Sequence, residues 1–325
     1  MSKPFPCALV LFLICFTSDL KCQYFSGQNS YWKSQRHSLG ASLGASFFLG
    51  ELGGRDQEGT GFIYDLELSK TRPAIQLMYR YQLGSRVYAK AHLGVAFIGG
   101  NDALTEEKYR RNRNLHFRST VFEFAISGEV VIIDLTSKNK FGRVKSSKLQ
   151  GSSIYITAGV GIARFNPQGN FEGTWYDLRD FGTEGQFIDG GPSPYSQYTV
   201  ILPFGIGYRL DLDKQWSLGF EVVHRTTFTD YMDDVSTDYF NNQIIKEEQG
   251  ELAAFFADPS LGFFLNEDGV IEELNSTFNG AQRGDPDDND AYFFASFTAY
   301  YKLSTKRFKK GRGRVTKRRR RRVVF

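Results

Sequence analysis

The feature that most constrains the fold is an alternation of side-chain types along single segments of the chain. Residues 39–50 read LGASLGASFFLG, with Leu, Ala and Phe on one phase of a period of two and mostly Gly and Ser on the other. Successive side chains of a β-strand point to opposite faces of the sheet. This segment is therefore predicted to be a strand with one apolar face and one face of very small side chains.

Seven further segments alternate in polarity, and each ends at turn residues. The eight predicted strands are residues 37–50, 73–83, 86–98, 119–135, 152–165, 198–212, 215–227 and 291–303. Long connections (50–72, 99–118, 166–197 and 228–290) alternate with short ones (84–85, 136–151 and 213–214). In an antiparallel sheet, the long and the short connections then lie at opposite ends.

This arrangement predicts an all-β fold, an eight-stranded antiparallel up-and-down transmembrane β-barrel with long extracellular loops and short periplasmic turns. A soluble lipocalin-like barrel is the alternative, because periodicity does not tell which phase faces inward. No Arg or Lys lies in the central part of any apolar phase, and one such residue at mid-bilayer costs about 2–4 kcal/mol. This absence favours the membrane barrel, closed so that no strand edge meets hydrocarbon.

The polar phase predicts a charged lumen. Seven charged residues fall on it, interspersed with glycines: Arg80, Lys90, Glu123, Glu129, Arg209, Glu221 and Arg225. Because eight strands enclose an interior that side chains fill, these four cations and three anions predict a salt-bridged plug across the barrel. A proton or ion pathway through the same residues is the alternative to this structural filling.

The N-terminal residues 1–22 are predicted to be a cleaved secretory signal. Lys3 precedes the apolar run 8–16, which is too short to span a bilayer as a helix. An uncleaved anchor and lipidation of Cys22 are the alternatives. All three cysteines lie in this segment, so the exported chain is expected to have no disulfide and no thiolate site. The expected organisation is a signal peptide (1–22), an N-terminal periplasmic segment (23–35), an outer-membrane barrel (36–303) and a polybasic tail (304–325).

The charge of the chain is divided between an acidic body and a basic tail. Of 40 Lys and Arg residues, twelve lie in the tail, which leaves 28 against 36 acidic residues elsewhere. The twelve are Lys306, Arg307, Lys309, Lys310, Arg312, Arg314, Lys317, Arg318, Arg319, Arg320, Arg321 and Arg322. Such runs often bind nucleic acid, but an exported protein would rarely meet any. Anionic lipid head groups or an acidic protein surface are the expected partners, and a solvated tail without a partner is the alternative.

Two acidic runs border the last long connection and are predicted to meet at the extracellular rim. The rim residues singled out are Asp230, Tyr231, Asp233, Asp234, Arg283, Gly284, Asp285 and Asp290. With Asp287 and Asp288, these acids could surround a calcium ion, but no calcium-loop spacing is present. The expectation is therefore no metal, with Asp, Asn and Pro shaping turns and Arg283 pairing with one carboxylate.

Catalysis is not expected. The four histidines, His37, His92, His116 and His224, stand in no evident Ser-His-Asp grouping, and no zinc spacing or glycine-rich phosphate loop is present. The sequence therefore predicts no enzyme, no cofactor and no small-molecule substrate.

Several motifs together resemble the PorG-like outer-membrane β-barrels of Bacteroidetes type IX secretion and gliding systems. The motifs are FLGELGG at the end of the first strand, RNLHFRS (113–119), RFNPQG (164–169), GTEGQ (182–186), TFTDYMDDVSTDY and RGDPDDNDAYFF. They occur in order across residues 36–303. The residues Asp230, Tyr231, Asp233, Asp234, Arg283, Gly284 and Asp290 match motif positions, whereas the arginine-rich extension after Leu303 departs from the family pattern.

The resemblance implies a non-catalytic barrel that anchors the periplasmic ring subunits of the secretion machinery to the outer membrane. The expected partners are then outer-membrane lipid and those ring subunits, with no nucleic acid. A general surface barrel, serving as an adhesin or envelope stabiliser through the connection 228–290, is the alternative. A porin is disfavoured because eight strands leave little aqueous bore.

Overall fold

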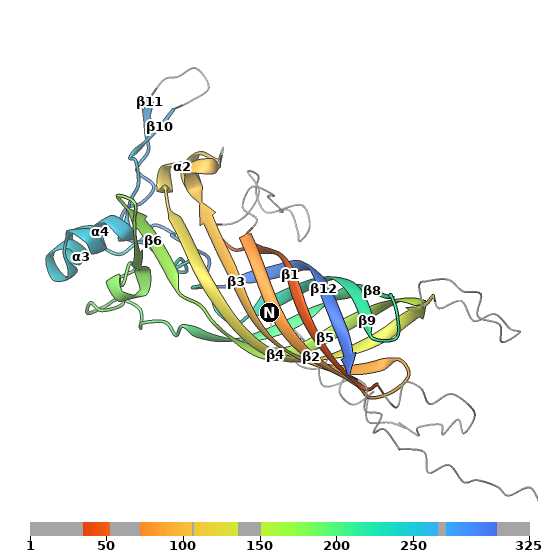
Figure 1. Cartoon of the computed structure of the whole chain (residues 1–325). Helices are drawn as coiled ribbons and strands as arrows, with labels where there is room; N and C mark the ends of the chain where they lie inside the picture. The colour runs from red at the N-terminus through yellow and green to blue at the C-terminus, as the bar shows by residue number, and fades with distance from the viewer. Residues whose placement is uncertain (1–34, 53–71, 106, 136–150, 266–270, 304–325) are drawn as a thin grey trace, which may run out of the picture.

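The computed structural model describes residues 35–52, 72–105, 107–135, 151–265 and 271–303. Its body is a ring of eight long antiparallel strands (Figure 1). These are β1 (His37–Leu49), β2 (Arg72–Gln82), β3 (Val87–Asn101), β4 (His116–Asp134), β5 (Gly151–Arg164), β8 (Tyr198–Asp211), β9 (Trp216–Thr227) and β12 (Ala291–Leu303). Each strand pairs with its neighbour along the chain, and β1 also pairs with β12. The predicted closed eight-stranded antiparallel barrel is therefore confirmed.

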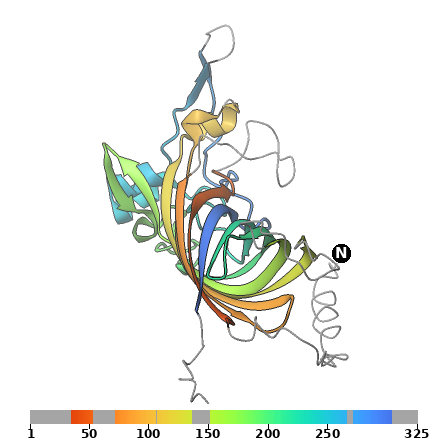
Figure 2. The same cartoon turned by 45° about the vertical axis from the view of Figure 1, so that its right-hand side comes forward.

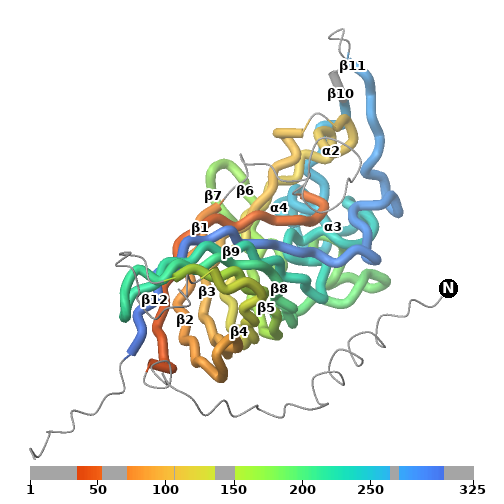
Figure 3. Tube along the Cα trace, turned by 90° about the vertical axis from the view of Figure 1, so that its right-hand side faces the viewer, coloured from red at the N-terminus to blue at the C-terminus, as the bar shows by residue number. Residues whose placement is uncertain are grey.

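The seam of the barrel joins its first and last strands. His37 lies opposite Leu303, and Leu49 lies opposite Ala291. Figure 3 shows these two strands side by side although they come from opposite ends of the colour scale. The same pairing puts the start of β1 and the end of β12 at one end of the barrel, the end of the short turns.

Two short connections at this end are ordered by local hydrogen bonds. The backbone N–H groups of Leu83 and Gly84 donate to the carbonyl of Val87. In the turn before β9, the carboxylate of Asp213 accepts from the backbone N–H of Gln215 and of Trp216, both at 2.6 Å. Most of the third connection that was predicted to be short, residues 136–150, lies outside the described residues.

The alternation in the sequence corresponds to a reversed polarity, with charge inside and apolar side chains outside. Leu77 is 62 % exposed and Leu93 is 61 % exposed on the outer face, whereas Arg80 is 2 % exposed inside. A soluble barrel would bury the leucines and expose the arginine. The outer face therefore suits contact with hydrocarbon. Separately, the described helices include none that is long and apolar enough to cross a membrane.

The glycines of the inner phase make room for large lumen side chains. A Cβ atom on Gly40 would lie 2.7 Å from the side chains of Met78 and Tyr300, and one on Gly207 would collide with the ring of Tyr155. Both approaches are much closer than ordinary van der Waals contact. The small residues of the opening alternation therefore face a crowded interior.

Beyond the barrel, the long connections form a second ordered layer, here called the crown (Figures 1 and 2). It contains η3 (Asp102–Leu104), α2 (Lys108–Arg113), β6 (Pro167–Phe171), β7 (Thr174–Asp177), η4 (Leu178–Phe181), α3 (Asn242–Gln249), α4 (Glu251–Ala257), β10 (Phe263–Leu265) and β11 (Ile271–Glu273). One apolar core is continuous from the upper lumen, at Phe117 and Phe294, to crown residues such as Met232 and Phe256. The crown is therefore packed onto the barrel mouth.

The ends of two strands differ from the prediction. β3 continues to Asn101 and β4 begins at His116, so their hairpin rises three residues further than the predicted strands 86–98 and 119–135. Ile98 and Phe117 lie on the inner phase but are apolar, because they belong to the core under the crown, and Arg118 on the outer phase is exposed. An apolar inner side chain beside a polar outer one reverses the pattern that marks the rest of the strand.

Candidate functional site in the lumen and the crown

The upper lumen is organised around the carboxylate of Glu123. Its two oxygens each accept one hydrogen bond from Arg225, at 2.9 and 3.0 Å. Gln76 donates at 3.0 Å, Tyr292 donates at 2.9 Å, and Nε2 of His92 lies 3.1 Å away. A buried carboxylate held by an arginine and several further donors is fully paired, so its burial is compatible with a stable fold.

The lower lumen holds two carboxylates that share one lysine. Nζ of Lys90 lies 2.9 Å from Glu221 and 3.2 Å from Glu129. Glu221 also accepts hydrogen bonds from Tyr155 at 2.6 Å and from Tyr300 at 2.9 Å. This arrangement links β3, β4, β5, β9 and β12 across the barrel axis.

Two arginines complete the lower network with longer contacts. Arg80 lies 3.5 Å and Arg209 lies 3.6 Å from the same oxygen of Glu129. Their guanidinium groups are also stacked on aromatic rings, because Arg80 lies 4.3 Å from the centroid of Tyr300, and both arginines lie 4.7 Å from that of Tyr88. Cation–π contact supplies part of the stabilisation that ion pairs at these distances do not.

The structure brings all seven predicted lumen charges together inside the barrel, in two clusters. The sequence reasoning did not assign Gln76, Tyr88, Tyr155, Tyr292 and Tyr300 to this network. Strand parity was the available signal for the last three, since Tyr155, Tyr292 and Tyr300 lie on the same phase as their strands' small polar residues.

In the crown, Arg283 and Glu184 form the central ion pair. Nη1 of Arg283 lies 2.9 Å from Oε1 of Glu184 and donates at 2.5 Å to the carbonyl of Asp234. Glu184 also accepts from the backbone N–H groups of Ser236 and Thr237. Arg283 was predicted to pair with a carboxylate of the acidic runs, but its main partner comes from the connection between β7 and β8, and Asp234 is more distant at 3.9 Å.

Asp234 is held by two hydroxyl groups, from Thr183 and Tyr195, both at 2.6 Å. Burial raises the pKa of Asp234 to about 6, although the neighbouring charge of Arg283 acts in the opposite direction. Tyr231 stacks on Tyr195 at 4.5 Å and donates to Glu184 at 3.2 Å. These contacts join the segment after β9 to the segment before β8.

A second buried ion pair ties the β3–β4 hairpin into the crown. Nε of Arg113 donates to Asp102 at 2.7 Å, and Nη2 donates to the same carboxylate at 3.2 Å. The remaining donors of Arg113 reach the carbonyls of Arg283 and Glu51 at 3.0 and 3.2 Å. Arg113 therefore holds together the β1–β2, β3–β4 and β9–β12 connections.

The acidic side chains at the rim do not form the single cluster that was considered for calcium. Asp285, Asp287 and Asp288 are exposed, and the Asp285 carboxylate accepts the backbone N–H of Asp287 within its own turn. Asp233 accepts the backbone N–H groups of Leu52 and Val235. The contacts within single turns, from Asp287 to Asp285 and from Val235 to Asp233, are the capping that the sequence favoured for these acids, whereas the contact with Leu52 joins distant parts of the chain.

A smaller group of three carboxylates does come together, from Glu51, Asp230 and Asp290. One carboxylate oxygen from each residue lies within 4.8 Å of the other two. Burial, followed by the charge of Glu51, raises the pKa of Asp230 to about 8. Burial also raises the pKa of Asp290 well above its ordinary value, and the charge of Asp233 adds to this effect. Glu51 was not predicted here, because its motif was interpreted only as the end of a strand.

Gly284, which also matched the family motif, has a steric role. A Cβ atom at this position would lie 2.7 Å from the backbone nitrogen of Ser236. The close approach lets the segments on either side of the crown's Arg283 pack backbone to backbone. The twelve basic tail residues, the signal segment 1–22 and most of the segment 23–35 lie outside the described residues.

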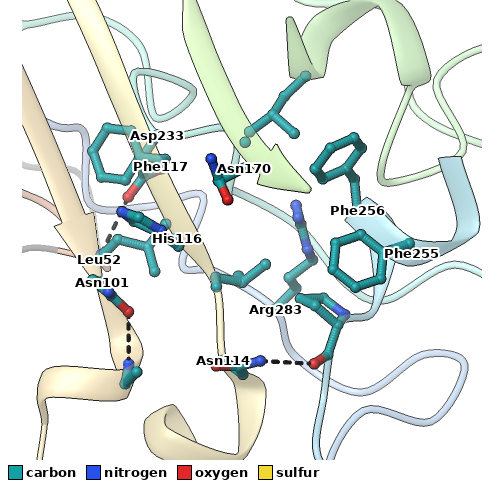
Figure 4. A pocket seen from close by; sticks show the side chains of 15 residues that line it. Leu52, Asn101, Asn114, His116, Phe117, Asn170, Asp233, Phe255, Phe256 and Arg283 are labelled. Atoms are coloured by element: carbon teal, nitrogen blue, oxygen red, sulfur yellow. Dashed lines mark hydrogen bonds between the residues drawn. The ribbon is translucent and has the colours of Figure 1, made fainter. Parts of the chain in front are cut away.

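One pocket of about 220 Å³ opens between the β3–β4 hairpin and α4 (Figure 4). Its lining is mixed, and includes Leu52, His116, Phe117, Phe256 and Arg283. Figure 4 shows Asn114 donating to the carbonyl of Pro259, at 3.2 Å, on the rim of this pocket. The guanidinium of Arg283 is engaged by Glu184, so the polar part of the lining comes mainly from Asn101, Asn170 and His116.

The solved structures that resemble this chain include outer-membrane barrels of low sequence identity. No family model matches the chain, and no curated protein matches it. Ail, the attachment invasion locus protein of Yersinia pestis, solved with the heparin analogue sucrose octasulfate, has 7 % identity and a TM-score of 0.35, over 83 % of this chain and 99 % of Ail. Neisserial surface protein A has 7 % identity and a TM-score of 0.34 over 82 % of this chain and 97 % of that protein. The outer membrane protein AlkL has 11 % identity and a TM-score of 0.30 over 86 % and 95 %.

At such low identity and TM-score, the likeness says nothing of activity or partners. The assignment of the barrel rests on the closed strand register and on the reversed polarity of its two faces. An apolar outer face around a charged, filled interior is the arrangement of outer-membrane barrels. The chain is an eight-stranded transmembrane β-barrel of the outer-membrane type.

Proposed function

We propose that this protein is a non-catalytic, non-conducting outer-membrane barrel that anchors the periplasmic ring of a type IX secretion machinery. The non-conducting character rests on the filled lumen, in which seven buried charged residues form two ion-paired clusters across the interior. An aqueous channel needs an open bore along its axis. In this barrel, side chains that are hydrogen-bonded to one another occupy the axis. The barrel therefore serves as a scaffold that presents its two ends.

The secretion role is supported by the family motifs and by where their residues lie. Arg113, Glu184, Asp234 and Arg283 come from four different motifs, and the crown joins them through direct contacts. Residues that are far apart in sequence but buried together in one network form a common structural element. The resemblance thus concerns residues that contact one another in the fold, as well as separate motifs in the sequence.

The topology supports a partner at the short-turn end. His37 and Leu303 are paired at this end, so the segment 23–35 and the basic tail both join the barrel there. Short turns of outer-membrane barrels are periplasmic. A tail with twelve cationic side chains would then face the periplasm, where an acidic surface of a ring subunit is the proposed partner.

The test is affinity purification of the tagged full chain from outer membranes in mild detergent. Deletion of residues 305–325, or replacement of the twelve basic residues by Gln at constant length, is expected to remove the periplasmic ring subunits from the eluate and to impair cargo secretion. Heat-dependent mobility in gel electrophoresis checks that the variant barrels remain folded. Normal secretion together with an unchanged set of co-purifying proteins would contradict the proposal.

The ordered crown favours a second candidate, a general surface barrel that acts as an adhesin or envelope stabiliser. The crown exposes aromatic side chains, including Tyr109, Phe187 and Phe278, which are side chains that binding surfaces commonly use. Under this candidate, no periplasmic partner co-purifies, and shortening the connection 228–290 abolishes surface binding while secretion continues. Under the first candidate, the same shortening leaves the ring subunits bound.

The non-conducting character has its own test, in planar bilayers. The wild-type barrel is expected to show no conductance of porin size, because Glu123 and Arg225 are paired across the lumen. Porin-sized conductance would overturn this part of the proposal and would leave the anchoring role to the purification experiment.

A further inference from the structure

The group of Glu51, Asp230 and Asp290 has no explanation in the anchoring role. The three residues come from different parts of the chain, since Glu51 follows β1, Asp230 lies after β9, and Asp290 directly precedes β12. These strands are neighbours in the barrel. Three carboxylates from three strand ends have therefore been brought to one point of the rim, although like charges repel one another.

Burial makes this arrangement more unusual, because the carboxylates lack the partners that other buried acids have. Asp230 is 5 % exposed and Asp290 is 1 % exposed. Both carboxylate oxygens of Asp230, Oδ1 of Asp290 and Oε2 of Glu51 are buried without a hydrogen bond of ordinary length among the described residues. The side chain of Ser236 lies near Asp230 and acts to lower its pKa, against the larger effect of burial. An unpartnered buried polar group usually indicates a missing ligand, ion or water.

The nearest arginines are engaged elsewhere. Arg113 is bonded to Asp102, and Arg283 is bonded to Glu184. The backbone N–H of Met232 donates to Asp290 at 2.8 Å, and that of Asp285 donates to Glu51 at 3.1 Å. Each of these two acids thus keeps one oxygen without a hydrogen bond of ordinary length among the described residues, and Asp230 keeps two.

We propose that Glu51, Asp230 and Asp290 bind a calcium ion at the crown. The donors are all carboxylate oxygens, the ligands that hard divalent cations prefer, and calcium accepts them at about 2.3–2.6 Å in irregular geometry. Oxygens within 4.8 Å of one another fit on a coordination shell about 4.6–5.2 Å across. Magnesium requires a tighter octahedron and gives up its water reluctantly, so it fits less well.

The rest of the local structure fits an ion at this place. Gly50 leaves room for Asp290, because a Cβ atom there would collide with Oδ1 of that carboxylate. Asp233 lies close enough to add negative potential. The ion would join the rims of β1, β12 and β9 and would hold the long connections onto the barrel mouth. A site of this kind needs only the affinity of extracellular calcium modules, with Kd of about 10⁻⁴–10⁻³ M.

The test uses the refolded full chain in zwitterionic detergent, with calorimetric titration of calcium chloride and, separately, of magnesium chloride. Wild type is expected to bind one calcium with Kd in the range of extracellular modules and to bind magnesium at least tenfold more weakly. Asp230→Asn and Glu51→Gln are expected to weaken calcium binding at least tenfold. Asp287→Asn removes an exposed carboxylate from the same acidic run, and it is the matched control that keeps wild-type affinity.

Thermal unfolding provides a second readout that a merely structural role would not produce. Calcium is expected to raise the Tm of wild type and of Asp287→Asn but not that of Asp230→Asn. In chelator above about pH 8, where Asp230 is ionised, Asp230→Asn is expected to have a higher Tm than wild type, because one repelling carboxylate is removed. The absence of saturable calcium binding, equal affinity in Asp230→Asn, or a lower Tm of that variant in chelator would each overturn the proposal.

Discussion

The lumen and the crown both bury carboxylates, but they neutralise them in different ways. Glu123 is surrounded by Arg225, Gln76, Tyr292 and His92, whereas Asp230 has no hydrogen bond of ordinary length among the described residues. The lumen thus supplies the counter-charges for its own carboxylates. The acidic group in the crown depends on a proton or a cation from outside. The barrel is therefore expected to tolerate changes of medium that loosen the crown.

The largest effect is expected from breaking the pairing of the lumen. Glu123→Ala leaves Arg225 buried without its counter-charge, which typically costs about 3–5 kcal/mol. Urea unfolding in lipid vesicles, followed by tryptophan fluorescence, measures this loss. The double variant Glu123→Ala/Arg225→Ala is expected to lose less than the sum of the two single variants, and strict additivity would argue against the pair.

A smaller and more local effect is expected from the paired part of the crown. Arg283→Gln leaves Glu184 with its backbone donors from Ser236 and Thr237, so the cost is that of a partly satisfied buried group, about 1–3 kcal/mol. The connection 228–290 should become more sensitive to protease, while the barrel keeps its heat-dependent mobility. Unfolding of the whole barrel by this substitution would show that crown and lumen are a single cooperative unit.

The lumen and the crown are distinguished most directly by the sign of the change in stability when a carboxylate is replaced by its neutral amide. In chelator above about pH 8, where Asp230 is ionised, Glu123→Gln is expected to destabilise the protein, whereas Asp230→Asn is expected to stabilise the crown by about 1–2 kcal/mol, since an unsatisfied buried charge is removed. Limited proteolysis and thermal unfolding report the two effects. The same sign for both variants would remove the distinction between a self-paired lumen and a crown that needs an external ion.

The last effect concerns pH. The pKa of Asp234 is raised from 3.8 to about 6, so the folded crown holds this proton more tightly than the unfolded chain does. Asp234 therefore contributes stability that is complete below about pH 4 and is lost as the pH rises through about 6. The stability difference between wild type and Asp234→Asn, followed by protease resistance of the crown from pH 4 to 7, should shrink over this interval. A difference that grows with pH would contradict the shift.

The barrel could be predicted from sequence because each strand repeats a simple rule. The period of two divides lumen from lipid, and the seven charges that this period placed on the polar phase lie inside the barrel, including Arg80 and Glu221. The alternating lengths of the connections then fixed the antiparallel order. Physical periodicity therefore carries most of the information about this half of the molecule.

The crown could not be predicted in the same way. Its helices α3 and α4 and the hairpin of β6 and β7 are short and have no repeated period, and its contacts join residues that are distant in sequence. Glu51 and Asp230 illustrate this, because nothing near either residue indicates the other. The acids that looked most like a metal loop, Asp285, Asp287 and Asp288, point to solvent instead.

The seam between β1 and β12 sets the order in which this protein can assemble. Until Ala291–Leu303 is in place, β1 and β9 each present an open row of backbone donors and acceptors, which hydrocarbon cannot satisfy. β12 follows the other seven barrel strands along the chain, and it is also the strand that completes the cylinder. Insertion is therefore expected to await β12, and a product that ends before β12 would remain an open sheet with unpaired strand edges.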